Sequence, residues 1–558
     1  MILAKRKDEL VFLPLGGVGE IGMNLGLYGI GPEFERNWLM VDCGLTFGGP
    51  DTPGVDLIFP DVKFIEDDRA NLAGIIITHA HEDHYGALTE LWPRLRAPVY
   101  MTPFAHGLLM AKYGGNQPDE HIPVTIVRAG DRHKIGPFDV EFVGMSHSLP
   151  EPMGLMLRTD QSNVFHSADW KLDPTPGFDV ATDLDQLKAL GDEGIHALVS
   201  DSTSVVTPGV SPSEADVSAS LKEIISEAPH RVIVTTFASH VGRIKAVIEA
   251  AADTGREVIA VGRSMERILS VARELGMLEG LPPIRDQEMF QSLPRSKVVL
   301  ICTGSQGESR AALARIAADE HRHISFAAGD RVIFSSRTIP GNERQVSHVI
   351  NNLSDRNVEI ITDRDALVHA SGHPRRDEVR QLYKALRPDV ALPVHGEPLH
   401  LAVHGRLASE MGVRQALSAR NGQIVRLAPD PAGVIDEVYA GRLHLDGRLL
   451  VDPLESGLQE RKKVAYAGHI AVAIVIDKKG NLLGEPQIAL TGLPDTDAVG
   501  EPFHEIVLDA VVGAIESIPR QRRKDAELVR ESARRAARAE TNQRWGKKPL
   551  CRVLVSVL

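Results

Sequence analysis

The sequence contains few cysteines. Its 558 residues include only Cys43, Cys302 and Cys551, which lie far apart and form no CxxC pair. This spacing excludes a disulfide framework of the kind that staples small secreted proteins. We therefore expect three small buried residues in a reducing compartment.

Long apolar runs are also missing. No uncharged apolar stretch reaches the ~20 residues that a membrane-spanning helix needs, and the opening MILAKRKDELVFLPLGG lacks the continuous apolar core of a signal peptide. These absences predict a cytoplasmic protein with no membrane partner.

The chain lacks an excess of positive charge. Its net charge is −13, whereas nucleic-acid phosphates are usually bound by a basic surface. A generic nucleic-acid binder is therefore disfavoured. A local basic groove stays compatible with this value, and bound divalent cations would add positive charge that the count omits.

The remaining composition is that of an ordinary globular protein, with 43% hydrophobic and 25% charged residues. Short β-rich runs fill the chain up to about residue 200, and strands then alternate with helical segments to about residue 365, which indicates a parallel sheet. We predict an α/β protein with a layered first domain (residues 1–208 and 366–430), an inserted domain (209–365), a linker (431–462) and a small C-terminal αβ domain (463–558).

The clearest chemical signal is an HxHxDH motif directly after the apolar strand AGIIIT. It places His79, His81, Asp83 and His84 within six residues. Imidazole and carboxylate groups suit zinc or a similar divalent ion. Because side chains alternate along an extended chain, His79 and His81 are expected to face one ion, and the following turn directs Asp83 and His84 to a second.

Four further candidate ligands follow other predicted strands: Asp42, His147, Asp169 and His395. Each alone is as compatible with a structural role as with a functional one. Together with the motif they supply the number of ligands that two metal ions require, including one bridging carboxylate.

The order of these motifs resembles that of the metallo-β-lactamase superfamily. The resemblance implies an αββα sandwich in which Asp42 orients the ligands. It implies two Zn²⁺ ions per chain, with Mn²⁺ or Mg²⁺ also active in vitro. One ion would be held by His79, His81 and His147, the other by Asp83, His84 and His395, with Asp169 between them. Two such ions can lower the pKa of a shared water and stabilise charge on phosphoryl oxygens, so phosphodiester hydrolysis is expected.

A rival interpretation rests on Gly17, Gly19 and Gly22, which form a literal GxGxxG after the strand LVFLPL. A dinucleotide site needs a helix to begin in this loop. The next residues, MNLGLYGIGPEFERN, carry three glycines and a proline and no helical pattern. We therefore expect a β-hairpin whose glycine turn lies near the metal site.

The insertion of about 150 residues narrows the range of expected substrates. The chain resembles the β-CASP subgroup, whose members are nucleases, in Asp201-Ser202-Thr203, HASGHP at 369–374 and PVHGE at 393–397. By that resemblance Asp83, Asp169 and His373 are catalytic, His373 assists at the phosphate, and Asp201 supports the ligands.

Within the subgroup, LPLGGVGEIGMN, THAHEDHYGAL, FASHVGR, VGRSM, CTGSQGE and HASGHP resemble the ribonuclease J family. The resemblance implies a 5′-to-3′ exoribonuclease with endonuclease activity in mRNA turnover and rRNA maturation. Two alternatives stay open: another hydrolase of the superfamily, such as a thioesterase or lactonase, and a catalytically silent RNA-binding scaffold.

The same resemblance implies which residues contact the RNA and its 5′ monophosphate: Ser239, His240, His369, Ala370, Ser371, Gly372 and His373. Position 240 departs from the family pattern, because we expect asparagine there. This leaves the details of nucleotide contacts in doubt but not the chemistry.

The C-terminal region contains an arginine-rich stretch from Pro519 to Lys548. A solvated, charged helix face is the simpler interpretation, and an RNA or partner surface is the alternative. By resemblance, this region supports a homodimer or homotetramer, and the protein joins an RNA-degradation complex.

Overall fold

The computed structural model describes residues 8–112, 121–178 and 181–558. Contacts divide the chain into two units. The first comprises Met1–Thr46 and Phe59–Gly441, and the second comprises Phe47–Ile58 and Arg442–Leu558. Each unit is described here by itself.

The larger sheet of the first unit has eight strands, in the spatial order β22 (Gly433–Glu437), β21 (Gln423–Ala428), β1 (Glu9–Gly16), β2 (Leu25–Gly31), β3 (Asn37–Val41), β6 (Leu72–Ile76), β7 (Val99–Met101) and β8 (Val124–Ile126). β1 pairs antiparallel with both β2 and β21. The chain thus returns to its first sheet some 400 residues later.

The second sheet has seven strands, in the order β20 (Gln415–Ala416), β19 (Val390–Val394), β13 (Ala197–Asp201), β12 (Asn163–His166), β11 (Met153–Arg158), β10 (Phe138–Gly144) and β9 (Arg132–Ile135). Apolar side chains of both sheets meet in one buried core, which includes Phe12 and Leu39 of the first sheet and Phe142 and Val199 of the second. The two sheets therefore pack face to face as a sandwich.

Helices cover the outer face of the second sheet. Side chains alternate along a strand, so Val199 faces the inter-sheet core while its neighbour Leu198 packs outward. That outer layer is formed by α5 (Leu184–Glu193), α11 (Arg376–Leu386) and α12 (Pro398–Glu410). The helices that precede α5 among the described residues are α1 (Lys63–Asp67), α2 (Glu82–Tyr85), α3 (Leu88–Leu95) and α4 (Pro103–Lys112), with a 3₁₀ turn at Arg69–Asn71.

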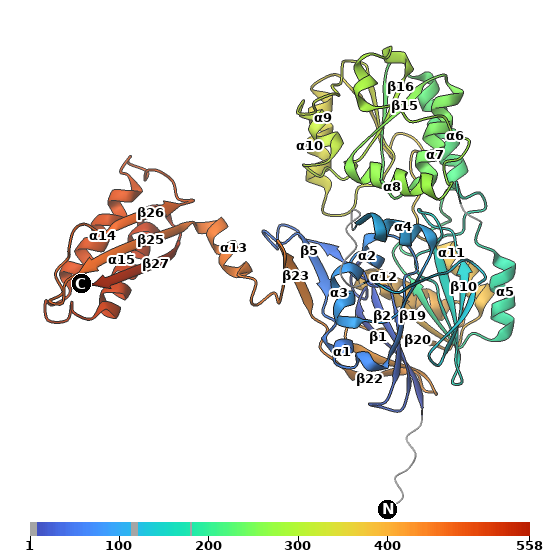
Figure 1. Ribbon diagram of the computed structural model, residues 1–558, viewed down its shortest axis with the longest axis horizontal. Coiled ribbons are helices and arrows are strands. Elements are labelled where there is room, and N and C mark those ends of the chain that lie inside the picture. Colours follow the sequence, from blue (N-terminus) through green and yellow to red (C-terminus); the bar gives the residue numbers. More distant parts are fainter. Residues whose placement is uncertain (1–7, 113–120, 179–180) are drawn as a thin grey trace, which may run out of the picture. The chain divides into compact units, whose positions relative to one another are not determined.

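The inserted segment forms a parallel sheet in the order β15 (Glu257–Val261), β16 (Val298–Cys302), β14 (Val232–Thr235), β17 (Arg331–Phe334) and β18 (Glu359–Ile361). Helices cover both faces, as parallel sheets require (Figure 1). One face packs on α6 (Glu214–Glu227), α7 (Val241–Asp253) and α8 (Arg263–Glu274), and the other on α9 (Ala312–Ala317) and α10 (Glu343–Ser354). Two 3₁₀ turns occupy Gln287–Gln291 and Arg295–Lys297.

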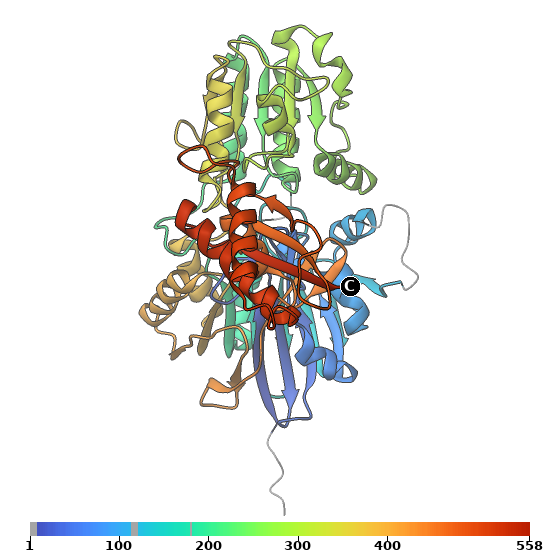
Figure 2. The same ribbon diagram turned by 90° about the vertical axis from the view of Figure 1, so that its left-hand side faces the viewer.

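The second unit contains two small sheets. The four-stranded sheet has the order β24 (Leu449–Val451), β23 (Arg442–Asp446), β5 (Leu57–Pro60) and β4 (Thr46–Phe47). After α13 (Leu458–Ala467), the three-stranded sheet has the order β26 (Gln487–Thr491), β25 (His469–Ile476) and β27 (Leu550–Val557). The helices α14 (Phe503–Ser517) and α15 (Ala526–Trp545) share one buried core with this sheet (Figures 1 and 2).

These observations confirm the expected fold class. The predicted domain limits stay predictions, but the segment 431–462, expected to be a linker, contains regular structure: β22 pairs with β21, and β23 pairs with β24. The described residues contain no helix that is both long enough and apolar enough to cross a membrane.

Candidate metal centre

The HxHxDH segment leaves the end of β6 and turns at once into the short helix α2. The backbone N–H of His84 donates to the carbonyl of His81 at 2.9 Å, which reverses the chain between them. As a result, His79 and His81 face one group of potential ligands, and Asp83 and His84 face another.

The first group contains His79, His81, His147 and Asp169. The Nε2 atoms of His79 and His147 each lie 3.2 Å from Nδ1 of His81, and Oδ2 of Asp169 lies 3.8 Å from both Nε2 atoms. Four ligands at ~2.1 Å from a tetrahedral zinc ion would be roughly 3.4 Å apart. The spacing and chemistry of this group therefore fit one zinc-like ion.

The second group contains Asp83, His84 and His395. Oδ2 of Asp83 lies 3.6 Å from Nε2 of His84 and 3.3 Å from Nε2 of His395. Oδ2 of Asp169 lies 3.3 Å from Nε2 of His84, so this carboxylate borders both groups. Its other oxygen, Oδ1, is buried and has no hydrogen-bond partner, which suits a group that binds cations on both sides.

Contacts behind the ligands hold their orientation. Asp42 accepts hydrogen bonds from the backbone and hydroxyl of Thr78 and lies 2.8 Å from Nδ1 of His84. The carbonyl of Gly372 lies 2.6 Å from Nδ1 of His147. Such partners fix which ring nitrogen faces a metal.

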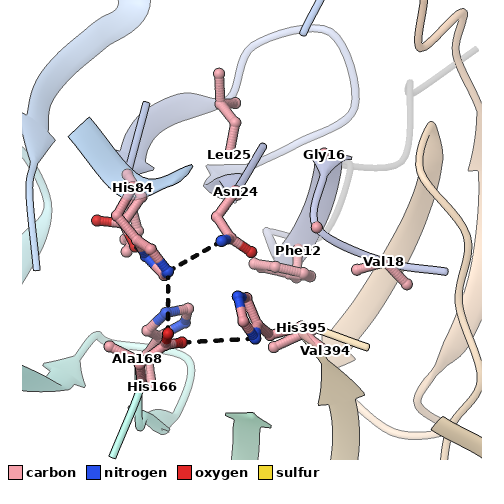
Figure 3. A pocket seen from close by; sticks show the side chains of 15 residues that line it. Phe12, Gly16, Val18, Asn24, Leu25, His84, His166, Ala168, Val394 and His395 are labelled. Atoms are coloured by element: carbon pink, nitrogen blue, oxygen red, sulfur yellow. Dashed lines mark hydrogen bonds and ion pairs between the residues drawn. The ribbon is translucent and has the colours of Figure 1, made fainter. Parts of the chain in front are cut away.

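Threonine 203 supports the second group in the same way. Its hydroxyl lies 2.6 Å from Nδ1 of His395, which leaves Nε2 of that ring facing Asp83. The side-chain amide of Asn24 lies 3.0 Å from Nε2 of His84 (Figure 3). This is the nitrogen that faces Asp83 and Asp169, so Asn24 lies on the ligand side of the ring. The orienting roles of Thr203 and Thr78 were not predicted, because hydroxyl groups carry no motif of their own.

Burial lowers the pKa values of His79 and His147 well below the ordinary range and lowers the pKa of His81 to about 4. These rings are therefore neutral, the form in which histidine binds metal. Burial opposes charge on Asp169, but the surrounding imidazoles, first that of His395, hold its pKa well below the usual value. The ligand set thus combines neutral imidazoles with an ionised carboxylate.

The two imidazoles of the second group behave differently. Burial alone would lower the pKa values of His84 and His395, but the nearby carboxylates, first that of Asp169, have the larger effect. The pKa of His84 therefore lies well above the ordinary value, and the pKa of His395 rises to about 10. A divalent cation bound at this group would take the place of those protons.

His373 stands at the edge of the cluster. Its Nδ1 lies 2.8 Å from Oδ2 of Asp201, and its side chain is 22% exposed while that of Asp201 is fully buried. The ring lies between those of His147 and His395, at centroid distances of 5.1 and 5.4 Å. The carboxylate therefore fixes Nδ1 and leaves Nε2 available to a substrate.

The other expected substrate contacts differ in accessibility. Ser371 and Gly372 lie beside the cluster, where the Ser371 hydroxyl accepts from the N–H of His373. His240 is buried, its Nδ1 accepts from the N–H of Arg243 at the start of α7, and its Nε2 faces Glu214. Whether Ser239, His240, His369 and Ala370 contact RNA stays a prediction.

A second buried cluster was not predicted from the sequence. Arg243 donates to Glu214 at 2.7 Å and to the carbonyl of Val368 at 2.8 Å, and Lys171 lies 2.8 Å from Asp173 and 3.3 Å from Glu214. We call Lys171, Asp173, Glu214 and Arg243 the ion-pair network. It ties the inserted segment to the chain immediately before His369.

The glycine-rich turn borders the metal cluster. Gly17, Gly19 and Gly22 all have positive φ, at 82°, 85° and 98°, and β2 follows them as a strand paired with β1. The expected hairpin is confirmed, and the helix that a dinucleotide site needs does not follow the turn. A cavity lined by Gly16, Gly17 and Asn24 reaches His84 and His395 (Figure 3).

Four protein-family profiles match the chain. They are described as a β-lactamase superfamily domain (residues 37–199), the β-CASP domain of ribonuclease J (229–353), a Zn-dependent metallo-hydrolase RNA specificity domain (357–417) and the ribonuclease J C-terminal domain (456–558). The first of these regions contains six of the proposed ligands, from His79 to Asp169, and the third contains the seventh, His395.

Curated relatives match over nearly the whole chain. A ribonuclease J of Sinorhizobium meliloti is 52% identical over 549 residues, which cover 98% of this chain and 97% of that protein. A ribonuclease J of Corynebacterium glutamicum is 37% identical and covers 96% of this chain and 74% of its own length. A crystal structure of a protein of unknown function from Enterococcus faecalis has a TM-score of 0.52 at 15% identity, covering 75% of this chain and all of that one, and shows the fold alone.

Proposed function

Because the chain belongs to the ribonuclease J family, and is thereby a metal-dependent ribonuclease, we propose that it degrades RNA from the 5′ end and also cuts internally. A 5′ monophosphate is the preferred end. We place its activity in mRNA turnover and rRNA maturation in the cytoplasm, as a homodimer or homotetramer within an RNA-degradation complex.

One observation supports the chemistry most strongly: two ligand groups border a single buried carboxylate, Asp169. We propose that His79, His81 and His147 hold one zinc ion, that Asp83, His84 and His395 hold another, and that Asp169 contacts both. Bound there, divalent cations would lower the pKa of a water and offset charge on the phosphoryl oxygens.

The proposed contribution of the protein's own groups is positioning and proton transfer. Asp201 accepts from Nδ1–H of His373, so Nε2 can carry a proton toward the phosphate. As water adds to phosphorus it releases one proton to solvent, and the P–O bond to the leaving oxygen breaks with its electron pair on that oxygen. Nε2–H of His373 protonates the leaving oxygen, and the ring then regains a proton from solvent. Asp42, Gly372 and Thr203 hold the ligand rings in the orientation that this step needs.

The proposal is tested with one RNA sequence carrying a 5′ monophosphate, triphosphate or hydroxyl, digested by metal-replete and chelator-treated full-length protein. We expect mononucleotides, released fastest from the monophosphate and only when metal is present. Metal-dependent internal fragments alone would contradict the exonuclease part. RNA that stays intact under every condition would contradict the whole proposal and favour an ester substrate or a silent scaffold.

A further inference from the structure

Two loops of the second unit carry exposed basic side chains. One is the turn at residues 477–481 after β25, and the other is the connection at 519–525 between α14 and α15. We call their exposed basic residues the loop patch: Lys478, Lys479, Arg520, Arg522 and Lys524.

The two loops are fixed against each other. Gly480 has a φ of +83°, and a Cβ added there would lie 2.6 Å from Cβ of Arg523, so only glycine allows this approach. Arg520 donates to the side-chain oxygen of Asn481 at 3.3 Å, and Nε of Arg523 donates to the carbonyl of Ile518 at 2.7 Å. The loop patch is therefore held in place by its own fold.

The acidic side chains of these loops accept hydrogen bonds from backbone N–H groups. Asp477 accepts from the N–H groups of Lys479 and Asn481, each at 2.8 Å. Asp525 caps α15 by accepting from two of its first N–H groups. Among the residues described, no carboxylate forms an ion pair with Lys478, Lys479, Arg522 or Lys524.

The neighbouring arginine-rich helix is different. In α15, Arg530 pairs with Glu527, and Arg534 and Arg535 both pair with Glu531. These pairs support the simple interpretation of that helix as a solvated charged face. Four of the five arginines in α15 thus have a carboxylate partner, whereas Lys478, Lys479, Arg522 and Lys524 form no ion pair among the described residues.

The negative charge of the chain is unevenly distributed between the two units. Basic and acidic side chains nearly balance in the second unit, so the net charge of −13 belongs almost entirely to the first. A polyanion is repelled by the first unit at long range, and it gains most from a site where several exposed cations form no ion pair with a carboxylate. The loop patch is such a site.

We propose that the loop patch binds the phosphate backbone of single-stranded RNA, an inference that rests on the proposed function of the chain. Neither loop contains an aromatic residue on which a base could stack. The contacts are therefore with phosphates, which makes the binding independent of sequence and strongly dependent on salt.

The test uses the full chain with Lys478→Gln, Lys479→Gln, Arg522→Gln and Lys524→Gln combined, leaving Arg520 to hold Asn481. Binding of a labelled RNA of about 30 nucleotides is measured by anisotropy across a salt series, with chelator present to prevent cleavage. We expect about tenfold weaker binding at low salt. The slope of log K against log salt should fall in magnitude by up to ~3, since each phosphate contact on a single strand contributes about 0.7.

The matched control removes the same charge from arginines that already have acidic partners, by combining Arg530→Gln, Arg534→Gln, Arg535→Gln and Arg552→Gln. It should bind RNA nearly as the unmodified chain does. The inference is overturned if the loop variant keeps the original affinity and slope, or if the control loses as much. It is also overturned if the loop variant loses only its binding to phosphatidylglycerol vesicles.

A second readout separates this inference from the proposed function. Hydrolysis of bis(p-nitrophenyl) phosphate reports the metal centre alone, because this small diester offers no chain of phosphates to the patch. The loop variant should hydrolyse it at the unmodified rate. If the unmodified chain cuts neither this ester nor RNA, the proposed function fails, and the binding comparison still decides the loop patch.

Discussion

Two buried groups of charged side chains lie in the first unit, and they are neutralised in different ways. In the ion-pair network, Glu214 and Asp173 are matched by Arg243 and Lys171 at 2.7 and 2.8 Å. In the metal centre, the ionised carboxylates meet only imidazoles: among the described residues, no lysine or arginine pairs with Asp83 or Asp169.

This difference in how the buried carboxylates are neutralised indicates the role of each cluster. Burying a carboxylate costs several kcal/mol unless a cation accompanies it. The ion-pair network supplies that cation from its own side chains and needs nothing further. The metal centre combines ionised carboxylates, neutral imidazoles and two imidazoles, His84 and His395, whose protons a bound cation would replace. Oδ1 of Asp169 is buried without a hydrogen-bond partner, so a divalent cation from solution fits this set. We expect the first cluster to hold the structure together and the second to bind metal.

The largest expected effect is loss of a metal ligand. His81→Ala should lower RNA hydrolysis by at least about 10⁴-fold, because it removes more than 5 kcal/mol of charge stabilisation at the phosphate. The unfolding temperature should change little, since a smaller, uncharged side chain replaces a ring that supports no ion pair of the network. The matched control is His348→Ala, which changes an exposed histidine of α10 and should keep full activity. Normal hydrolysis by the His81 variant would refute the assignment of His81 as a metal ligand.

Breaking the other cluster should produce the opposite pattern. Glu214→Gln leaves the buried charge of Arg243 without a carboxylate partner and leaves Lys171 with Asp173 alone, which costs about 3–5 kcal/mol of unfolding free energy. Denaturant titration measures this loss. Glu257→Gln, which breaks the exposed pair with Arg285, should have little effect. Equal stability of the two variants would mean that the network does not hold the fold.

His373→Gln tests the residue at the edge of the metal centre. Loss of proton transfer should lower kcat by about 10²–10³-fold, whereas the metal content should stay that of the unmodified protein, because His373 is not among the seven proposed ligands. The pH–rate profile should lose one limb. A variant with normal kcat, or one that lacks metal, would contradict a role in proton transfer.

Removing a supporting contact should have a smaller effect. Asp42→Asn replaces the carboxylate beside Nδ1 of His84 and should weaken metal affinity by about 10–100-fold. Excess metal should then restore most of the activity, which separates this variant from those that lack a ligand. Competition with a chelating dye gives the affinity; an unchanged value would show that Asp42 does not orient His84.

The smallest expected effect concerns acid. Burial raises the pKa of Glu214, but His240, Arg243 and Lys171 outweigh it and hold the pKa below its usual value. A carboxyl with a depressed native pKa stabilises the fold fully above the unfolded value of about 4.3, and this contribution is lost as the pH falls further. The stability gap between the unmodified protein and Glu214→Gln should therefore narrow from pH 6 to pH 3; a constant gap would contradict this.

The sequence predicted the metal centre better than the ion-pair network for a physical reason. His79, His81, Asp83 and His84 are neighbours in the chain, so strand alternation and one turn decide where they point. The partners Lys171, Glu214 and Arg243 come from segments that meet only after the inserted sheet has packed, and ordinary charged residues carry no spacing signal. The buried position of His240 against Glu214 follows from the same packing.

Pairing between strands that lie far apart in the sequence was the other feature that could not be predicted. The hairpin of β1 and β2 was predicted because its turn is local, and its glycines have the positive φ that the turn requires. The assignment of residues 47–58 to the second unit was not predicted. It depends on β4 and β5 joining a sheet with β23, nearly 400 residues later.

The most direct test of the central claim is a titration of metal-free, full-length protein with Zn²⁺, following bound metal and RNA hydrolysis in the same samples. The account predicts that hydrolysis is absent at the start, rises with bound zinc and reaches its maximum at two ions per chain. Full hydrolysis by the metal-free protein would contradict it, as would zinc binding at these sites that leaves the RNA intact.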